Sequence, residues 1–132
     1  MNYKGTIIEE SLQDTSVLKD VTIVETKVEP ITPEHKTPWL RQWTLHSVEI
    51  PEEKAQEVAE KISRIFDIEH PDWYADYKND SYHFIIFQGK VFKVDLNNPV
   101  LYTEAKKYGV SLGIPEYQVD FAPKDKIWNQ KN

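Results

Sequence analysis

The chain of 132 residues contains no cysteine. This absence excludes disulfide bonds, thiol nucleophiles, cysteine-ligated zinc and iron–sulfur clusters. No apolar run approaches the roughly 18 residues that a transmembrane helix needs. Residues 1–12 also lack the apolar core of a secretory signal. We therefore expect a cytoplasmic protein without a membrane segment.

Glycine is scarce, and none of the four glycines lies in a P-loop or a dinucleotide-binding pattern. The nucleophile motif GxSxG is also missing. The histidines, at positions 35, 46, 70 and 83, do not have the spacing of a metal site. The sequence therefore predicts no metal and no cofactor.

Positive charge is in deficit, because 22 acidic residues outnumber 16 lysines and arginines and give a net charge of −6. Nucleic-acid binders usually present a basic surface to the phosphates, so this balance argues against a nucleic-acid partner. The hydrophobic fraction of 39% and the aromatic fraction of 12% are those of an ordinary folded domain. We expect one domain over residues 1–121, followed by a polar tail at 122–132.

Strands are predicted at 6–12, 21–31, Gln42–Ile50 and 117–121, where β-branched residues are frequent and apolar residues partly alternate. Helices are predicted after Pro51 and Pro99, because proline suits the first position of a helix. The fold class is α+β, a mainly antiparallel sheet with both helices on one face. From residue 42 onward the order is related to the ferredoxin-like fold, with extra N-terminal strands.

Residues 73–92 carry seven of the sixteen aromatic side chains and two turn signals, and they predict a three-stranded meander. With Asn79 and Asp80 at the first turn, Asp76 lies directly opposite His83. With Gly89 first in the second turn, Phe87 lies opposite Phe92. Both faces of this meander are apolar, so two helices on one face would leave the other face for the N-terminal strands, another protomer or a ligand.

A carboxylate beside an imidazole raises the pKa of the histidine and orients its tautomer, as general acid–base catalysis requires. Asp76 and His83 are therefore the candidate catalytic residues. A structural hydrogen-bonded pair near a hairpin end is the alternative interpretation.

Two stretches, residues 35–48 and 81–94, contain no acidic residue and are rich in aromatic and basic side chains. If the strand at Gln42–Ile50 lies beside the meander, they form a positive, aromatic surface for an anionic ligand. The alternative is that the aromatic rings belong to the core and the cations lie at its edge. The candidate binding residues are Trp39, Arg41, Trp73, Tyr82, Phe84 and Lys93.

Three segments, TPWLRQWTLHSVEIPEEKA, WYADYKNDSYHFIIFQGKVFKVD and YGVSLGIPEYQVDF, cover most of the chain. Through these three segments, the chain resembles a family of small uncharacterised prokaryotic proteins. The resemblance implies a stand-alone cytoplasmic domain, and it carries over no activity, substrate or catalytic residue.

The preferred hypothesis is a binding or interaction domain that uses the meander, Trp39 and Arg41. Its partner would be another protein, a second copy of the chain, or a small anionic ligand. The alternative is a small enzyme in which Asp76 orients His83 and Lys93 or Arg41 holds an anionic substrate. A weaker reading is single-stranded nucleic-acid binding by stacking on Trp73, Tyr82 and Phe84.

Overall fold

The structure, a computed structural model, describes residues 1–33, 37 and 39–121, and the predicted tail at 122–132 lies outside this range. The strands are β1 (Tyr3–Ile8), β2 (Thr22–Pro30), β3 (Gln42–Ile50), β4 (Tyr74–Lys78), β5 (Tyr82–Phe87) and β6 (Lys90–Asp95). The helices are α1 (Ala55–Ile65) and α2 (Leu101–Ser111), with 3-10 turns η1 (Glu9–Ser11), η2 (Thr15–Asp20), η4 (Glu52–Lys54) and η5 (Glu116–Gln118).

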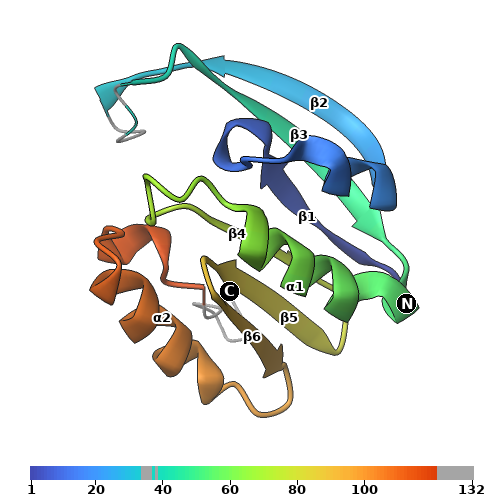
Figure 1. Cartoon of the computed structure of the whole chain (residues 1–132). Helices are drawn as coiled ribbons and strands as arrows, with labels where there is room; N and C mark the ends of the chain where they lie inside the picture. Colours follow the sequence, from blue (N-terminus) through green and yellow to red (C-terminus); the bar gives the residue numbers. More distant parts are fainter. Residues whose placement is uncertain (34–36, 38, 122–132) are drawn as a thin grey trace.

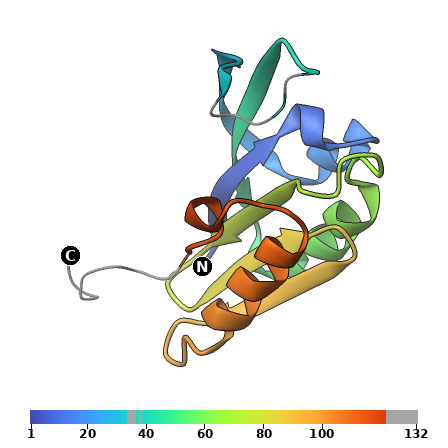
Figure 2. The ribbon, with the colours of Figure 1, turned by 90° about the vertical axis from the view of Figure 1, so that its left-hand side faces the viewer.

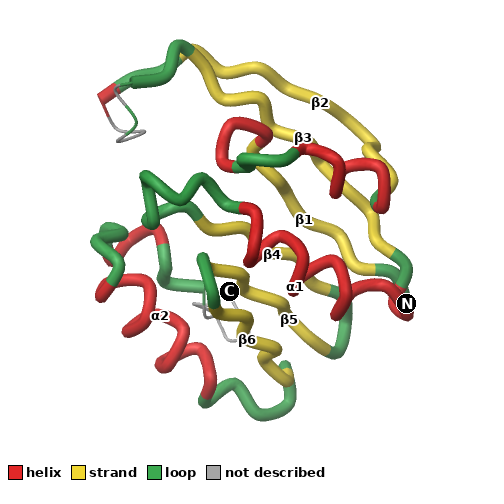
Figure 3. The backbone as a smooth tube through the Cα atoms, viewed as in Figure 1, coloured by secondary structure: helices red, strands yellow, loops and turns green. Residues whose placement is uncertain are grey.

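The six strands form one sheet in the order β2-β3-β1-β4-β5-β6, and every neighbouring pair is antiparallel (Figures 1 and 3). This confirms the α+β class with an antiparallel sheet. Both β3 and β4 pair with β1, which lies between them, so β3, α1 and β4 form a split β-α-β unit of the kind found in ferredoxin-like folds. β3 has the bounds that its alternating pattern predicts.

The two helices cover opposite faces of the meander formed by β4, β5 and β6. Phe84 and Ile86 of β5 pack in the cluster that contains Val58 and Ile62 of α1. The intervening Ile85 and Phe87 pack in a second cluster with Tyr102 and Ala105 of α2. Figure 2 shows α2 running in front of the strands of the meander. Side chains alternate across a strand, so these clusters lie on different faces. The prediction of both helices on one face is therefore wrong, and no apolar face of the meander is left without cover.

Both hairpins of the meander are shifted by two residues from the predicted register. Asp76 lies opposite Ile85, and Lys78 lies opposite His83. Phe87 lies opposite Lys90, so Gly89, with φ +76°, is the second residue of its turn and not the first. A shift by two leaves every side chain on its predicted face, because the side-chain period of a strand is also two. The predicted division into two faces is therefore correct although the pairing is not.

The predicted strand at 117–121 is also wrong. This segment begins with η5, and its apolar residues Val119 and Phe121 pack in the cluster beneath α2. Its alternating pattern is satisfied by packing against a helix and not by pairing at a sheet edge.

The other half of the sheet, β1, β2 and β3, has cover on one face only. Leu12 lies between η1 and η2, and Val17 lies within η2. Both residues of this η1–η2 segment pack in the same cluster as α1. Figure 1 shows this segment in front of β1 and β3, on the same side as α1. On the α2 side of these strands, the described residues place no helix or turn except η5, which reaches only their edge. Every residue of β2 is at least partly exposed.

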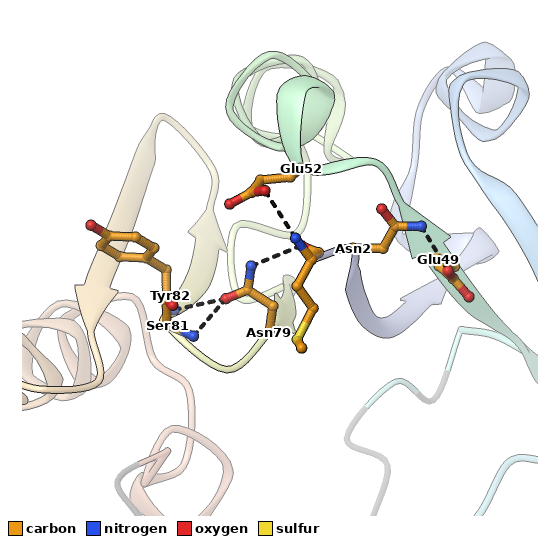
Figure 4. Close-up of polar contacts among 7 residues, drawn as sticks. Asn2, Glu49, Glu52, Asn79, Ser81 and Tyr82 are labelled. Atoms are coloured by element: carbon orange, nitrogen blue, oxygen red, sulfur yellow. Dashed lines mark hydrogen bonds and ion pairs between the residues drawn. The ribbon is translucent and has the colours of Figure 1, made fainter.

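The two halves meet where β1 pairs with β4. Gly5 lies opposite Tyr77, and Thr6 lies opposite Asp76. At the end of this pairing, the Asn79 side chain donates to the Met1 carbonyl oxygen over 3.0 Å (Figure 4). The Met1 ammonium group forms an ion pair with Glu52 at 2.9 Å. These contacts fix the position of β1 against the first hairpin.

Candidate active site

Asp76 and His83 contact each other, as the sequence predicts, although they are not directly opposite across the strands. The Nε2 atom of His83 lies 2.6 Å from Oδ2 of Asp76. Both side chains point to the α2 face, and the two-residue shift makes them diagonal neighbours, which lie within reach of long side chains. His83 is only 3% exposed, so it cannot itself contact a substrate. The Asp76 side chain is 36% exposed.

The register follows from the chemistry of the first turn. Oδ1 of Asn79 accepts hydrogen bonds from the backbone N–H groups of Ser81 at 2.8 Å and of Tyr82 at 2.9 Å. This is the local side-chain-to-backbone pattern that Asn favours in turns. It places Asn79 at the end of β4 and Ser81 within the loop, which moves His83 two positions along relative to Asp76.

Tyr102 is a third member of the group that the sequence did not reveal. Its hydroxyl lies 2.8 Å from Nδ1 of His83, and its side chain is buried on the first turns of α2. The only signal in the sequence is that Tyr102 shares a helical face with Ala105 and Gly109. That pattern does not show which face of the sheet α2 covers, so the contact was not predictable.

The tyrosine hydroxyl completes a hydrogen-bonded chain to the carboxylate. Burial and the charge of Asp76 raise the pKa of Tyr102 to about 12, so the phenol keeps its proton at neutral pH. His83 joins the two side chains, with Nδ1 at the Tyr102 hydroxyl and Nε2 at the Asp76 carboxylate. The chain Tyr102–His83–Asp76 thus holds one carboxylate oxygen. No described residue forms a hydrogen bond to the other oxygen.

Asp76 lies in the wall of an open cleft of about 450 Å³, at the boundary between the two halves of the sheet. Thr6, Ile8 and Leu45 come from the half with one covered face, and they share a face with Asp76 by their register. The lining comprises Thr6, Ile8, Thr32, Thr37, Trp43, Leu45, Asp72, Trp73, Tyr74, Ala75, Asp76, Pro115 and Gln118. Small-molecule sites have volumes of about 300–1,000 Å³, which includes this one.

Two aromatic residues give the cleft its shape. The indole N–H of Trp43 donates to Oγ1 of Thr37 over 2.9 Å, which holds the ring at the wall. Tyr74 packs edge-on against Phe121, with ring centroids 5.6 Å apart. Burial, followed by the charge of Asp76, raises the pKa of Tyr74 to about 12, so this phenol is also neutral. Trp73 is 5% exposed, and its indole N–H is the one buried side-chain donor without a partner in the described residues.

The predicted binding residues do not form one surface. Trp73 and Phe84 are buried in the α1-side core. Lys93 lies over the Tyr82 ring at 4.3 Å, on the same face as Phe84. This arrangement matches the alternative in which the rings belong to the core and the cation lies at its edge.

Trp39 and Arg41 are both exposed, in the segment between β2 and β3. Trp39 stacks on His70, with ring centroids 3.7 Å apart. The strand β3 is separated from β5 by β1 and β4, so the two acid-free stretches do not lie side by side. The expected positive, aromatic surface is therefore not formed.

A second buried histidine was also missed by the sequence analysis. His46 lies 2.8 Å from Oε1 of Glu9 and 2.8 Å from Oγ1 of Thr26. These contacts join η1, β2 and β3 on the α1 side of the sheet. The lining of the cleft beside Asp76 does not include His46, Glu9 or Thr26, and their contacts hold the strands together.

Among residues 1–33, 37 and 39–121, histidine and acidic side chains do not gather into a set of three or more that could hold a metal ion. The helices of this part of the chain are also too short or too polar to cross a membrane. No protein-family model matches the chain, and searches of curated proteins and of solved structures find no match. The cleft and its side chains therefore carry the functional argument.

Proposed function

We propose that the protein is a small cytoplasmic binding domain that takes a small organic molecule in the cleft beside Asp76. The observation that carries this proposal is a carboxylate oriented by buried groups in the wall of an otherwise largely apolar cleft. Binding sites combine apolar walls with a few placed polar groups in this way. The preferred interaction surface thus moves from the meander to the boundary of the two half-sheets.

The earlier reason for self-association, an uncovered apolar face on the meander, no longer applies because α1 and α2 cover both faces. Nucleic-acid stacking also loses its platform, since Trp73 and Phe84 are buried. Two features support the cleft as the binding site instead. It opens at the surface, and the exposed polar residue Thr6 lies next to Asp76.

A fragment screen followed by two-dimensional NMR tests the proposal. We expect ligands to shift the backbone resonances of Thr6 and Leu45 and the indole signal of Trp43, and to leave Trp39 unchanged. Thr6→Phe, which fills the cleft, should abolish binding. Thr22→Phe makes the same change at an exposed β-strand position outside the cleft and should not affect it. A screen in which no fragment shifts these resonances contradicts the proposal.

Acid–base catalysis is a second candidate, favoured by the Tyr102–His83–Asp76 chain that ends at the cleft. Because His83 is buried with both ring nitrogens occupied, the group that would contact a substrate is Asp76 and not His83. Ligands from the screen can be followed by NMR for chemical conversion. An enzyme would convert at least one of them, and Asp76→Asn would stop conversion while some binding remains; stable ligands throughout would favour a binding protein.

A further inference from the structure

The charged side chains that line the cleft are of one sign. Asp72 and Asp76 are acidic, and the described lining contains no lysine, arginine or histidine. By register, Lys4 and Lys78 lie opposite each other two positions beyond Thr6 and Asp76, and Lys27 lies opposite the lining residue Leu45. None of the three lysines belongs to the lining, and Lys27 forms an ion pair with Glu29 at 3.4 Å. An anionic ligand would therefore meet two carboxylates and no compensating charge within the cleft.

Asp76 has one carboxylate oxygen left for a ligand. Its Oδ2 atom lies 2.6 Å from Nε2 of His83, and no described residue forms a hydrogen bond to Oδ1. Burial, and after it the charge of Asp76, raises the pKa of both Tyr74 and Tyr102. Within the described residues, Asp76 has no lysine or arginine partner.

The rest of the wall suits the other parts of a cationic molecule. Trp43 and Tyr74 are half-buried side chains of the lining, and aromatic rings attract ammonium and guanidinium groups within about 6 Å. Ile8 and Leu45 provide an apolar surface beside them. Thr6 lies directly across from Asp76. Its hydroxyl can accept one hydrogen bond from a ligand ammonium group whose other N–H donates to Asp76.

We infer that the ligand of this cleft is an organic cation, a protonated amine on an apolar body, whose ammonium group pairs with Asp76. This inference rests on the proposed binding function and specifies its ligand class. Asp76 is the specificity-determining residue, and His83 and Tyr102 are positioning residues that hold its carboxylate. The charges in the lining thus favour a cationic ligand over the anionic ligand that the sequence suggests.

Three probes with one body and different head groups test the class: 3-phenylpropylamine, 3-phenylpropanol and 3-phenylpropionate. By NMR titration we expect the amine to bind at least tenfold more tightly than the other two, with shifts at Thr6, Leu45 and Trp43. Its affinity should fall with added salt, because the pair is partly open to solvent. Equal affinity of the three probes at the cleft would overturn the cationic class and leave the binding function standing; no shift at the cleft from any probe would overturn both.

Matched variants assign the effect to Asp76. Asp76→Asn should weaken amine binding at least tenfold and should weaken propanol binding by a smaller factor, because the alcohol loses a hydrogen bond and no ion pair. Asp80→Asn removes the same charge at the exposed hairpin tip and should have no effect. Unchanged amine binding by folded Asp76→Asn would overturn the inference.

A gain-of-charge variant keeps the test valid if Asp76→Asn does not fold. Thr6 is exposed, so Thr6→Lys can place a cation beside Asp76 without disturbing the core. We expect Thr6→Lys to lose the amine and to gain affinity for the propionate, whereas Thr22→Lys should retain the original preference. An unchanged preference in Thr6→Lys would contradict a site that selects by charge.

Discussion

The two halves of the sheet differ in how they are covered. The meander β4–β6 lies between α1 and α2, and the central strand β5 is buried from His83 to Phe87. Strands β1–β3 have cover on the α1 side only, and β2 is exposed along its length. The first half contributes the buried aromatic residues Tyr77, Phe84 and Phe87 to the core, whereas the second half supplies the open wall of the cleft. Stability and the candidate function thus lie mainly on different sides of the β1–β4 junction.

Gly5→Ala should have the largest effect, because it breaks the junction between the halves. A Cβ atom at Gly5 would collide with the carbonyl oxygen of Asp76 and lie 2.6 Å from Cα of Tyr77, and backbone atoms cannot move aside cheaply. We expect a loss of about 4–5 kcal/mol or more in the free energy of unfolding. Urea denaturation followed by circular dichroism measures it, with the exposed neighbour Lys4→Ala as the control. A loss below about 1 kcal/mol would mean that β1 can separate from β4 without unfolding the domain.

Phe87→Ala should cost about 3–5 kcal/mol, because Phe87 is fully buried among Phe92, Tyr108 and Tyr74. In the open half, Leu45→Ala removes a half-buried side chain and should cost less than about 2 kcal/mol, below the range for fully buried leucines. The same denaturation experiment compares them. Equal losses would show that the cleft wall is packed as tightly as the meander.

Alkaline pH should destabilise the protein through its buried tyrosines. The pKa values of Tyr74 and Tyr102 are raised from 10.0 to about 12, and burial also raises the pKa of Tyr77. A raised folded-state pKa gives stability that is complete below pH 10 and is lost as the pH rises from about 10 to 12, because the unfolded state releases these protons first.

Urea midpoints at several alkaline pH values test this prediction. The double variant Tyr74→Phe and Tyr102→Phe should show a smaller decline with pH, whereas Tyr117→Phe, which removes an exposed phenol, should match the parent. If the urea midpoint of the double variant declines with pH as steeply as that of the parent, groups other than Tyr74 and Tyr102 cause the alkaline destabilisation.

Val28→Ala on β2 should have the smallest effect. Val28 is 54% exposed on an edge strand, so we expect a change within about 0.5 kcal/mol in the free energy of unfolding. A larger loss that grows with protein concentration would reveal that β2 is covered by another molecule.

The local parts of the structure were predictable to different degrees. The bounds of β3 and the two faces of the meander follow from side-chain alternation, which a two-residue shift does not alter. The pairing itself was wrong because the Asn79 side chain, bonded to Ser81 and Tyr82, decides where the first turn lies. The contact of Asp76 with His83 was nevertheless predicted, since diagonal neighbours can still reach each other.

Side-chain alternation along the chain is enough to make β5 apolar on both faces and to place Asp76 and His83 on one of them. Three features depend on long-range packing: α2 covers the second face, Tyr102 joins the pair, and β1, β3, β4 and η5 line a cleft. The physical reason is the range of the interactions. Alternation and turn chemistry act between neighbours in the chain, whereas an amphipathic helix can satisfy its apolar side on any apolar face within reach of its connections.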